Sequence, residues 1–551
     1  MAPTRRGAWA MTAAGPGTAA RRALTAPLSL VVALMLVPGL VSAEPQAGGG
    51  PLGDWKTEAN SRIEQIRKRD VEIVVADRYG HPVPVAGIQA SQRKHDFAFG
   101  SCINTNALSN PEYASFFLQH FEWAVFENES KWFFNEPQRD FENYSSADAL
   151  VEFCEQNGIL IRGHCIFWAK EEYTPGWCRS LPPGELSGEV DERLDHAVPR
   201  FKGHFLHWDV NNEMLDGDFF RRKLGAGIEP YMFIRAHELD PGALLFVNDY
   251  STVECCSGRV QAYINQVRSL QAAGAPVHGV GVQGHYWTST VDPVGTLARL
   301  DQLSSLGLPI WFTEYDTVNA DENARAEALE NLYRAAFSHP SVHGILMWGF
   351  WAGSHWRGAD AAIVDLDWTV NAAGRRYEDL MAEWTTNGSG ATGPDGSYHY
   401  RGFHGTYEVT TQAGGAPIVS TFQVPPAAGP AVFLVPLKDG ACFPAREVRS
   451  VRLAHDGGTS TTTLSWDMIP WRSDMASTTD VLRSADPADF ETATVCLETD
   501  DGSDAAAIDM ATPAAGSVFF YLVRGEYDCH NGEGSLGAGS DGTQRTGRIC
   551  R

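Results

Sequence analysis

Short apolar runs alternate with longer segments of helical periodicity through the first two thirds of the chain. The runs are four to six residues long and read as buried strands, whereas apolar residues three or four apart, as in Val260, Tyr263, Ile264 and Val267, indicate amphipathic helices. The eight predicted strands are 97–102, 123–126, 159–164, 205–210, 243–248, 280–283, 310–313 and 344–348. Eight strands alternating with helices predict an α/β fold, a (β/α)8 TIM barrel. A doubly wound sheet would show the same alternation, but no G-x-G-x-x-G follows the first strand, which argues against a dinucleotide site.

The segment before the barrel predicts a helix over 55–69 and a β-hairpin extension. Residues 71–75 and 85–92 are β-branched or alternate in polarity, and Tyr79-Gly80-His81-Pro82 lies between them as a turn signal. We therefore expect residues 54–386 to form the barrel with its N-terminal β-hairpin.

The composition changes after Trp384. Residues 385–397 are rich in Gly, Ser, Thr and Asn, and 398–409 and 418–424 read as a hairpin, so 387–430 is predicted to be a linker and hairpin. Residues 431–551 form a predicted β-rich C-terminal domain, an all-β sandwich. Its expected strands are 432–435, 448–453, 461–466, 479–482, 493–497 and 517–524.

Residues 1–43 read as a signal peptide. Four arginines precede the first acidic residue, 28–41 is apolar, and Val41-Ser42-Ala43 is a small-residue cleavage motif. We expect secretion, extracellular or periplasmic, with no membrane contact after cleavage; an uncleaved anchor is the alternative. The ten cysteines would then be in an oxidising compartment. Cys442, Cys496, Cys529 and Cys550 could stabilise the C-terminal domain in a pairing that the sequence leaves open.

The net charge limits the classes of partner. A formal charge of −25 and a pI near 5.1 argue against nucleic acid and against anionic membranes, both of which require a basic face. They are compatible with a neutral substrate. We expect a monomer without a cofactor. No cysteine or histidine spacing is typical of a metal site, so no metal is expected either.

Polar side chains follow the predicted strands at the end where barrel enzymes place their active sites. Glu213 follows the fourth predicted strand, and Glu314 follows the seventh. Two carboxylates on one rim are the requirement of glycoside hydrolysis. The other candidates at strand ends are Glu127, Asn128, Lys131, His164, Trp168, Asn212, Tyr250, Gln283, His285, Asp316, Trp348 and Trp356.

In a retaining mechanism Glu213 would be the acid/base, kept protonated by neighbouring negative charge, and Glu314 the nucleophile. His285 could orient Glu314, with Asp316 holding the imidazole, and Asn212 could bind the sugar 2-hydroxyl. Glu127, Asn128, Lys131 and His164 could bind other hydroxyls, and Trp348 and Trp356 could stack on sugar rings. Taken alone, a residue of each of these types is more often a surface or core residue than a functional one. The prediction depends on their shared position at the C-terminal ends of the barrel strands.

These motifs together resemble glycoside hydrolase family 10, the endo-1,4-β-xylanases, over residues 54 to 384. The matching pieces are Glu127-Asn128 with Lys131-Trp132, Arg162-Gly163-His164 with Trp168, Trp208-Asp209-Val210 with Asn212-Glu213, Asn248-Asp249-Tyr250, Gln283 with His285, Thr313-Glu314 with Asp316, and Trp348-Gly349 with Trp356. The resemblance implies a retaining endo-hydrolase of β-1,4-xylan that requires no metal. It implies that Glu213 is the acid/base and Glu314 the nucleophile, and that Glu127, Asn128, Lys131, His164 and Trp168 surround the glycone sugars.

Departures from the family pattern leave the catalytic pair intact. Asn211 and Tyr315 stand where the family usually has aliphatic residues, and 349–355 differs from the commonest xylanases, which affects the expected specificity near Trp351. The C-terminal region is similar to a fibronectin type III-like module at Leu464-Ser465-Trp466 and 521–524, a resemblance that implies no activity. Two other functions stay open: a related β-1,4-glycanase acting on glucan or mixed-linkage substrate, and a carbohydrate-binding protein without turnover.

Overall fold

The computed structural model describes residues 55–76, 82–413, 417–437, 449–456, 461–467, 477–492, 494–501, 506–514, 516–527 and 547. The predicted signal peptide and three of the four C-terminal cysteines, Cys442, Cys529 and Cys550, lie outside these ranges. Within the ranges, no helix combines the length and the apolar character needed to cross a bilayer.

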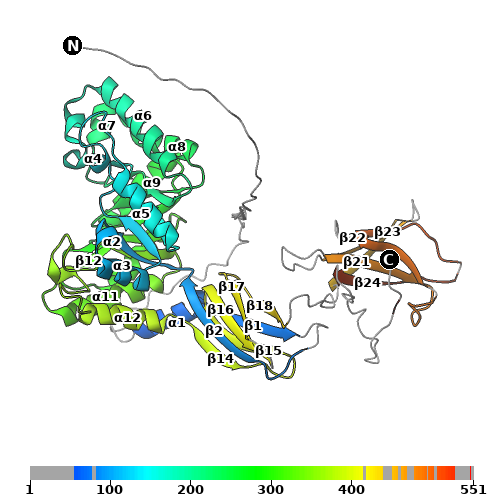
Figure 1. Ribbon diagram of the computed structural model, residues 1–551. Coiled ribbons are helices and arrows are strands. Elements are labelled where there is room, and N and C mark those ends of the chain that lie inside the picture. The colour runs from blue at the N-terminus through cyan, green and yellow to red at the C-terminus, as the bar shows by residue number, and fades with distance from the viewer. Residues whose placement is uncertain are drawn as a thin grey trace, which may run out of the picture. The chain divides into compact units, whose positions relative to one another are not determined.

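Eight parallel strands close into a barrel, as the sequence predicts (Figure 1). They are β3 (Ala98–Ile103), β4 (Trp123–Phe126), β5 (Leu160–Gly163), β7 (Phe205–Asp209), β9 (Leu244–Asp249), β10 (Gly279–Val282), β12 (Ile310–Thr317) and β13 (Val342–Met347). The barrel is closed because β13 pairs with β3, beginning with Gly344 opposite Ala98. All eight predicted strands are confirmed, and their observed ends lie within a few residues of the predicted ones.

Helices cover the outside of the barrel. The longer ones are α3 (Pro111–His120), α5 (Ser145–Gln156), α6 (Pro183–Arg200), α8 (Ile228–Leu239), α9 (Ser257–Ala272), α10 (Pro293–Ser304), α11 (Glu322–Phe337) and α12 (Ala372–Glu383). Several begin at a side chain that accepts hydrogen bonds from the first free backbone N–H groups, as Asn110, Asp292, Asp321 and Asn371 do. These caps fix where each helix leaves the loop that follows a barrel strand.

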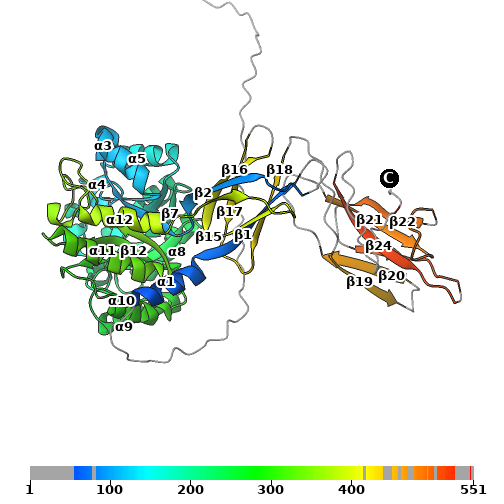
Figure 2. The ribbon, with the colours of Figure 1, turned by 90° about the horizontal axis from the view of Figure 1, so that it is seen from below.

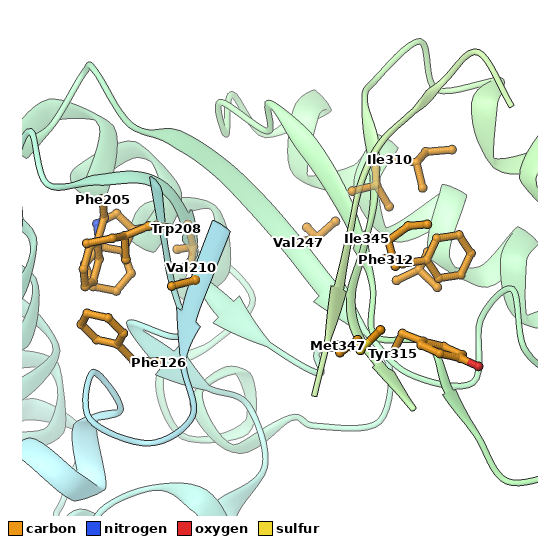
Figure 3. Close-up of a cluster of buried hydrophobic side chains, with 14 of the residues drawn as sticks. Phe126, Phe205, Trp208, Val210, Val247, Ile310, Phe312, Tyr315, Ile345 and Met347 are labelled. Atoms are coloured by element: carbon orange, nitrogen blue, oxygen red, sulfur yellow. The ribbon is translucent and has the colours of Figure 1, made fainter. Parts of the chain in front are cut away.

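Alternate residues of each barrel strand face opposite sides. On β12, Ile310 and Phe312 pack outward in the main core, whereas Trp311 lies in a second cluster inside the barrel with Phe246 and Leu346. Figure 3 shows part of the outer cluster, to which β4, β7, β9, β12 and β13 contribute. Complete burial of each such side chain stabilises the fold by roughly 1.5–3 kcal/mol. The two layers hold the strand ends rigidly in place.

Three short strands extend the end of the barrel that carries the candidate site. They are β6 (Phe167–Trp168), β8 (Asn211–Asn212) and β11 (His285–Tyr286). β6 pairs with β8, which sets Trp168 opposite Asn212, and β11 pairs with β12, which sets His285 opposite Asp316. Residues from distant parts of the chain are thereby placed in register.

The predicted N-terminal hairpin is wrong in its pairing. Strands are present at β1 (Lys68–Ala76) and β2 (Gly87–His95), after the predicted helix α1 (Trp55–Ile66), but they belong to two different sheets (Figure 2). Among the described residues, the last residue of β1, Ala76, forms a bridge with Pro82, which precedes β2. Four partner strands come from the segment predicted as a linker and hairpin: β14 (Asn387–Ala391), β15 (Ser397–Phe403), β16 (Gly405–Gln412) and β17 (Ile418–Val424). The fifth, β18 (Ala431–Pro436), comes from the start of the predicted C-terminal domain.

The two sheets have the orders β15-β1-β18 and β14-β2-β16-β17 and share one hydrophobic core. Val71 and Ile73 of β1 are buried with Ile88 of β2 and Val409 of β16, which a two-stranded hairpin could not achieve. The predicted strand 398–409 is divided at Gly405, whose φ of +147° and close approach to the Lys94 carbonyl turn the chain from one sheet to the other. The predicted hairpin of β16 and β17 is confirmed.

The C-terminal region contains six described strands in two three-stranded sheets. They are β19 (Arg449–Asp456), β20 (Thr461–Asp467), β21 (Ser477–Ser484), β22 (Thr494–Asp501), β23 (Ala506–Asp509) and β24 (Phe520–Tyr527). Leu464, Trp466, Val481 and Val523 from both sheets form its core, in agreement with the predicted all-β sandwich. The strand expected at 432–435 does not belong here, because it pairs with β1. Cys496 forms a disulfide.

Candidate active site

The two candidate carboxylates are buried at the C-terminal end of the barrel. Glu314 is the fifth residue of β12 and is 4% exposed, and Glu213 directly follows β8 and is 6% exposed. The backbone of Glu213 has a φ of +60°, in the left-handed region that residues with a side chain rarely adopt. Such strained positions occur where the surrounding structure fixes a side chain for a purpose.

Glu314 lies among hydrogen-bond donors and cationic groups. The Asn248 side-chain amide donates to Glu314 Oε1 at 2.7 Å, and His285 Nε2 lies 3.3 Å from Oε2. Burial alone raises the pKa of Glu314, but His164, His285 and Lys131 outweigh it, so the pKa lies below its usual value. A nucleophilic carboxylate must be ionised to attack, and these neighbours favour the ionised form of Glu314.

His285 is held between two carboxylates. Its Nδ1 lies 3.1 Å from Asp316 Oδ2, and its Nε2 faces Glu314. Burial lowers the pKa of His285, but Asp316 and Glu314 raise it more strongly, to about 10. Asp316 also accepts from Trp356 Nε1 at 2.7 Å and from Arg357 Nη1 at 2.6 Å. The imidazole is therefore a fixed cation beside Glu314, in the arrangement that the sequence predicts.

Glu213 has a different environment. The Gln283 amide donates to Glu213 Oε1 at 2.9 Å, and Lys170 Nζ lies 3.0 Å from Oε2. Lys170 also donates to the Tyr250 hydroxyl at 3.1 Å, and that hydroxyl donates to Asp216 at 2.5 Å. Burial lowers the pKa of Lys170, but Glu213 and Tyr250 raise it above its usual value. A cation therefore lies directly beside Glu213, a contact that the sequence did not predict.

Asn212 lies between the two carboxylates in the hydrogen-bond network. Its Oδ1 accepts from Asn248 at 3.0 Å and is 3.5 Å from the Gln283 amide nitrogen, so it connects the partners of Glu314 and Glu213. Its buried Nδ2 has no hydrogen-bond partner among the described residues. A buried donor without a partner costs about 1–3 kcal/mol, which a bound hydroxyl would offset. Asn212 is thus suited to bind a sugar.

Lys131 is the centre of a second group of candidate sugar-binding residues. Its Nζ donates to Asn128 Oδ1 at 3.3 Å and lies 4.9 Å and 5.3 Å from the ring centroids of Trp168 and Trp348. Trp168 stacks on Tyr173 with 4.0 Å between ring centroids. Aromatic faces beside hydroxyl-binding groups are typical of carbohydrate sites.

His164 and Glu127 are held by neighbouring side chains. His164 Nδ1 contacts Asp209 at 2.8 Å and lies 3.9 Å from Glu314 Oε1, and Asp209 forms a buried ion pair with Arg162. Glu127 Oε2 accepts from the Asn104 amide at 2.8 Å.

Three tryptophans of the site differ in exposure. Trp348 is 6% exposed, whereas Trp356 is 48% and Trp287 66% exposed. The Arg357 guanidinium lies 4.5 Å from the Trp287 ring centroid. Trp356 and Trp287 together offer exposed apolar faces near His285, which lies 5.0 Å from Trp356 between ring centroids.

The structure places every predicted site residue at this end of the barrel. Four further residues contribute to the site without a role predicted from the sequence: Lys170, Asn248, Trp287 and Arg357. Lys170 is two residues after Trp168 and Asn248 lies at the end of β9, so a search of all strand ends for polar residues could have found both. Within the described ranges, no three His, Cys, Asp or Glu side chains are grouped in a way that could hold a metal ion.

Comparisons with known proteins relate the barrel to glycoside hydrolases. Residues 88–374 match the family model of Glycosyl hydrolase family 10. The chain is 53% identical over 361 residues to Anti-sigma-I factor RsgI6 of Acetivibrio thermocellus, covering 66% of this chain and 47% of that protein. It is 40% identical over 385 residues to Endo-1,4-beta-xylanase 3 of Arabidopsis thaliana, covering 68% of this chain and 50% of that one.

Among solved structures, the native xylanase 10B from Thermotoga maritima is 25% identical with a TM-score of 0.48, covering 52% of this chain and 95% of that one. The chain spans about half the length, or less, of the curated relatives named above.

Proposed function

This chain belongs to glycosyl hydrolase family 10, and we propose from this premise that it is a secreted, retaining endo-1,4-β-xylanase. Glu213 is the acid/base and Glu314 the nucleophile. The observation that carries the proposal is the network in which Gln283 contacts both Glu213 and Asn212, while Asn248 contacts both Asn212 and Glu314. The Asn212 amide is thereby connected to Glu213 through Gln283 and to Glu314 through Asn248, at the buried centre of the site.

The first step breaks the glycosidic bond. The Glu314 carboxylate attacks the anomeric carbon, and Glu213 gives its proton to the oxygen that leaves. As positive charge develops on the ring, the Asn212 amide is available to bind the adjacent hydroxyl. His285 and Asn248 hold the two carboxylate oxygens of Glu314 in place. The entropy cost of positioning the nucleophile is therefore met by folding and does not add to the activation free energy.

The second step releases the bound sugar. Glu213, now a carboxylate, accepts a proton from water while the water oxygen attacks the anomeric carbon and displaces Glu314. Two inversions leave the product with the original β configuration. Lys131, Asn128, His164 and Glu127 would bind the sugar on the glycone side, beside the face of Trp168.

A second candidate function is polysaccharide binding with slow or no turnover. Two observations favour it: the cation of Lys170 beside Glu213, and the high identity to a protein named as an anti-sigma factor. A third is hydrolysis of glucan or mixed-linkage glucan by the same pair of carboxylates.

Reducing-sugar release from xylan, cellulose and mixed-linkage β-glucan separates these functions. We expect release from xylan, with the β anomer appearing first by proton NMR, and its loss in Glu314→Ala. Glu238→Ala, which removes an exposed glutamate paired with Arg235, is the control. Release from glucan alone, binding without release, or an initial α anomer would each contradict the proposal.

A further inference from the structure

Cys255 and Cys256 are adjacent in the loop between β9 and α9, and both are exposed. Their sulfur atoms are 2.8 Å apart, with the Cys255 thiol directed at the Cys256 sulfur. The other free cysteines of the described residues, Cys102, Cys154, Cys165 and Cys178, are buried. This pair is therefore the accessible dithiol within the described part of the chain.

The surroundings of the pair make its two sulfur atoms unequal. Cys256 is the residue that precedes the first turn of α9. The Cys255 thiol, the backbone N–H groups of Arg259 and Gly258 and the Arg299 guanidinium together lower the pKa of Cys256. The hydrogen bond to Cys256 raises the pKa of Cys255. Cys256 is thus the more acidic thiol of the pair and the better nucleophile, and the Cys255 thiol is directed at it.

The loop that carries the dithiol is tied to the active site by its preceding residue. The Glu254 carboxylate accepts from the Gly284 backbone N–H at 2.6 Å and from the Thr252 N–H at 2.8 Å. Gly284 lies between Gln283, the partner of Glu213, and His285, the partner of Glu314. A displacement of Glu254 would therefore reach both candidate catalytic groups.

A second connection begins on the other side of the dithiol. Arg259, three residues after Cys256, forms an ion pair with Asp216. Asp216 accepts from the Tyr250 hydroxyl, which in turn accepts from Lys170. This chain of contacts ends at Glu213, 3.0 Å from Lys170.

We propose that Cys255 and Cys256 form a reversible redox site, which closes into a disulfide between adjacent residues by exchange with a small-molecule disulfide and thereby slows the reaction in the neighbouring site. The Cys256 thiolate attacks one sulfur of the small disulfide, whose S–S bond breaks and releases one thiolate. Cys255 then loses its proton to water, and its sulfur attacks Cys256 and releases the second thiolate. Two protein thiols are oxidised and one small disulfide is reduced to two thiols.

Closure of this ring has to move the backbone. Adjacent Cα atoms are about 3.8 Å apart across a trans peptide, whereas disulfides usually join Cα atoms about 4.4–6.8 Å apart. The peptide between Cys255 and Cys256 must adjust, and Glu254 and the first turn of α9 adjoin it directly. A disulfide under such strain is also easily reduced, so the site is reversible.

Peptide mapping tests the chemistry directly on the full chain. After treatment with oxidised glutathione and then alkylation, we expect the tryptic peptide that ends at Arg259 to carry no alkyl group and to lack two hydrogens. Dithiothreitol should restore both thiols. Cys255→Ser should stop at a mixed disulfide of glutathione with Cys256, whereas Cys256→Ser should keep a free Cys255 thiol. Two alkylated thiols in the treated wild type, or equal reactivity of the two variants, would overturn the assignment.

Activity tests the coupling, and this arm rests on the proposed xylanase function. We expect xylan hydrolysis by the oxidised chain to fall at least about twofold and to recover with dithiothreitol, because both contact chains lead to catalytic groups. The double variant Cys255→Ala/Cys256→Ala should not respond to glutathione disulfide. An unchanged rate in fully oxidised wild type would overturn the coupling. If the chain does not hydrolyse xylan at all, the mapping result still decides the redox site.

Discussion

Lys170 Nζ lies 3.0 Å from Glu213 Oε2, so a cation directly contacts the residue that we propose as the proton donor. Gln283 holds the other oxygen of Glu213 through its neutral amide. Lys170 and Gln283 together therefore fix both carboxylate oxygens of Glu213.

Lys170→Met should lower kcat/KM on xylan by roughly tenfold, because Glu213 Oε2 loses the ammonium that positions it. Lys170→Arg should keep more of the rate, because its cation is retained. Lys202→Met, which removes a distant exposed lysine, is the control. An unchanged rate in Lys170→Met would show that this contact does not position Glu213.

Glu213→Ala should affect two kinds of substrate to different extents. Xylan has a poor leaving group that needs protonation, so we expect its kcat/KM to fall by about 10²–10⁴-fold. An aryl xylobioside whose phenolate leaves without a proton should lose far less rate in its first step. The value of kcat/KM on both substrates measures the difference, because it reports the first step, whereas kcat on the aryl substrate also includes the second step, in which Glu213 is the base. Equal losses of kcat/KM on both would show that Glu213 is not the acid.

The charge on His285 should make stability depend on pH. Its pKa is raised to about 10 in the folded chain by Asp316 and Glu314, against burial, which lowers it. The folded state thus favours the protonated form, and this contribution is complete below the unfolded pKa of about 6.5 and is lost as the pH rises through about 10.

We expect the difference in unfolding free energy between wild type and His285→Gln to shrink between about pH 6.5 and about pH 10. Urea denaturation followed by near-ultraviolet circular dichroism measures it. His204→Gln, at an exposed histidine paired with Glu155, is the control. A difference that stays constant with pH would mean that His285 is neutral in the folded chain.

Trp287→Ala should weaken substrate binding more than it changes the chemical step. The ring is 66% exposed and lies near Trp356, with 6.4 Å between centroids, but it contacts neither Glu213 nor Glu314 in the described network. Loss of one stacking face, at about 0.5–1.5 kcal/mol, predicts a rise in KM of roughly 2- to 12-fold at similar kcat. Phe141→Ala, which removes an exposed ring distant from Trp287 in the sequence, is the control. A fall in kcat with KM unchanged would contradict a binding role.

The barrel could be predicted from the sequence because the pattern that identifies each strand lies within a few consecutive residues. Each strand is a short apolar run bounded by polar residues, and the polar residue after it lies on the rim whichever helix follows. The sequence alone therefore predicts that Glu213 and Glu314 lie at the same end of the barrel. The role of Lys170 could not be predicted in the same way. Its contact with Glu213 is between side chains that follow two different strands, and it depends on the conformations of both side chains, which the sequence does not specify.

The pairing of β1 shows a second limit. Val71 lies opposite Tyr400 on one side and Ala431 on the other, more than 300 residues away along the chain. The alternation of Val71, Ile73 and Val75 fits a hairpin and a sandwich equally well, because it specifies a buried face and not the strand that covers it. The predicted boundary at 386/387 separates strands that the structure pairs.

Truncation tests this corrected organisation. A chain that ends at residue 386 keeps the whole barrel but loses β14 to β18, the strands that cover β1 and β2. Val71, Ile73 and Val75 would become exposed, at a cost of roughly 1.5–3 kcal/mol each, which is comparable with the total stability of about 5–15 kcal/mol of a typical domain. We expect this chain to aggregate or to melt well below the full-length protein. A chain that ends at residue 437 keeps the two sheets β15-β1-β18 and β14-β2-β16-β17 and should melt close to it. Calorimetry and size-exclusion chromatography on both chains measure the effect. Equal stability and solubility of the two would show that the barrel does not depend on these two sheets.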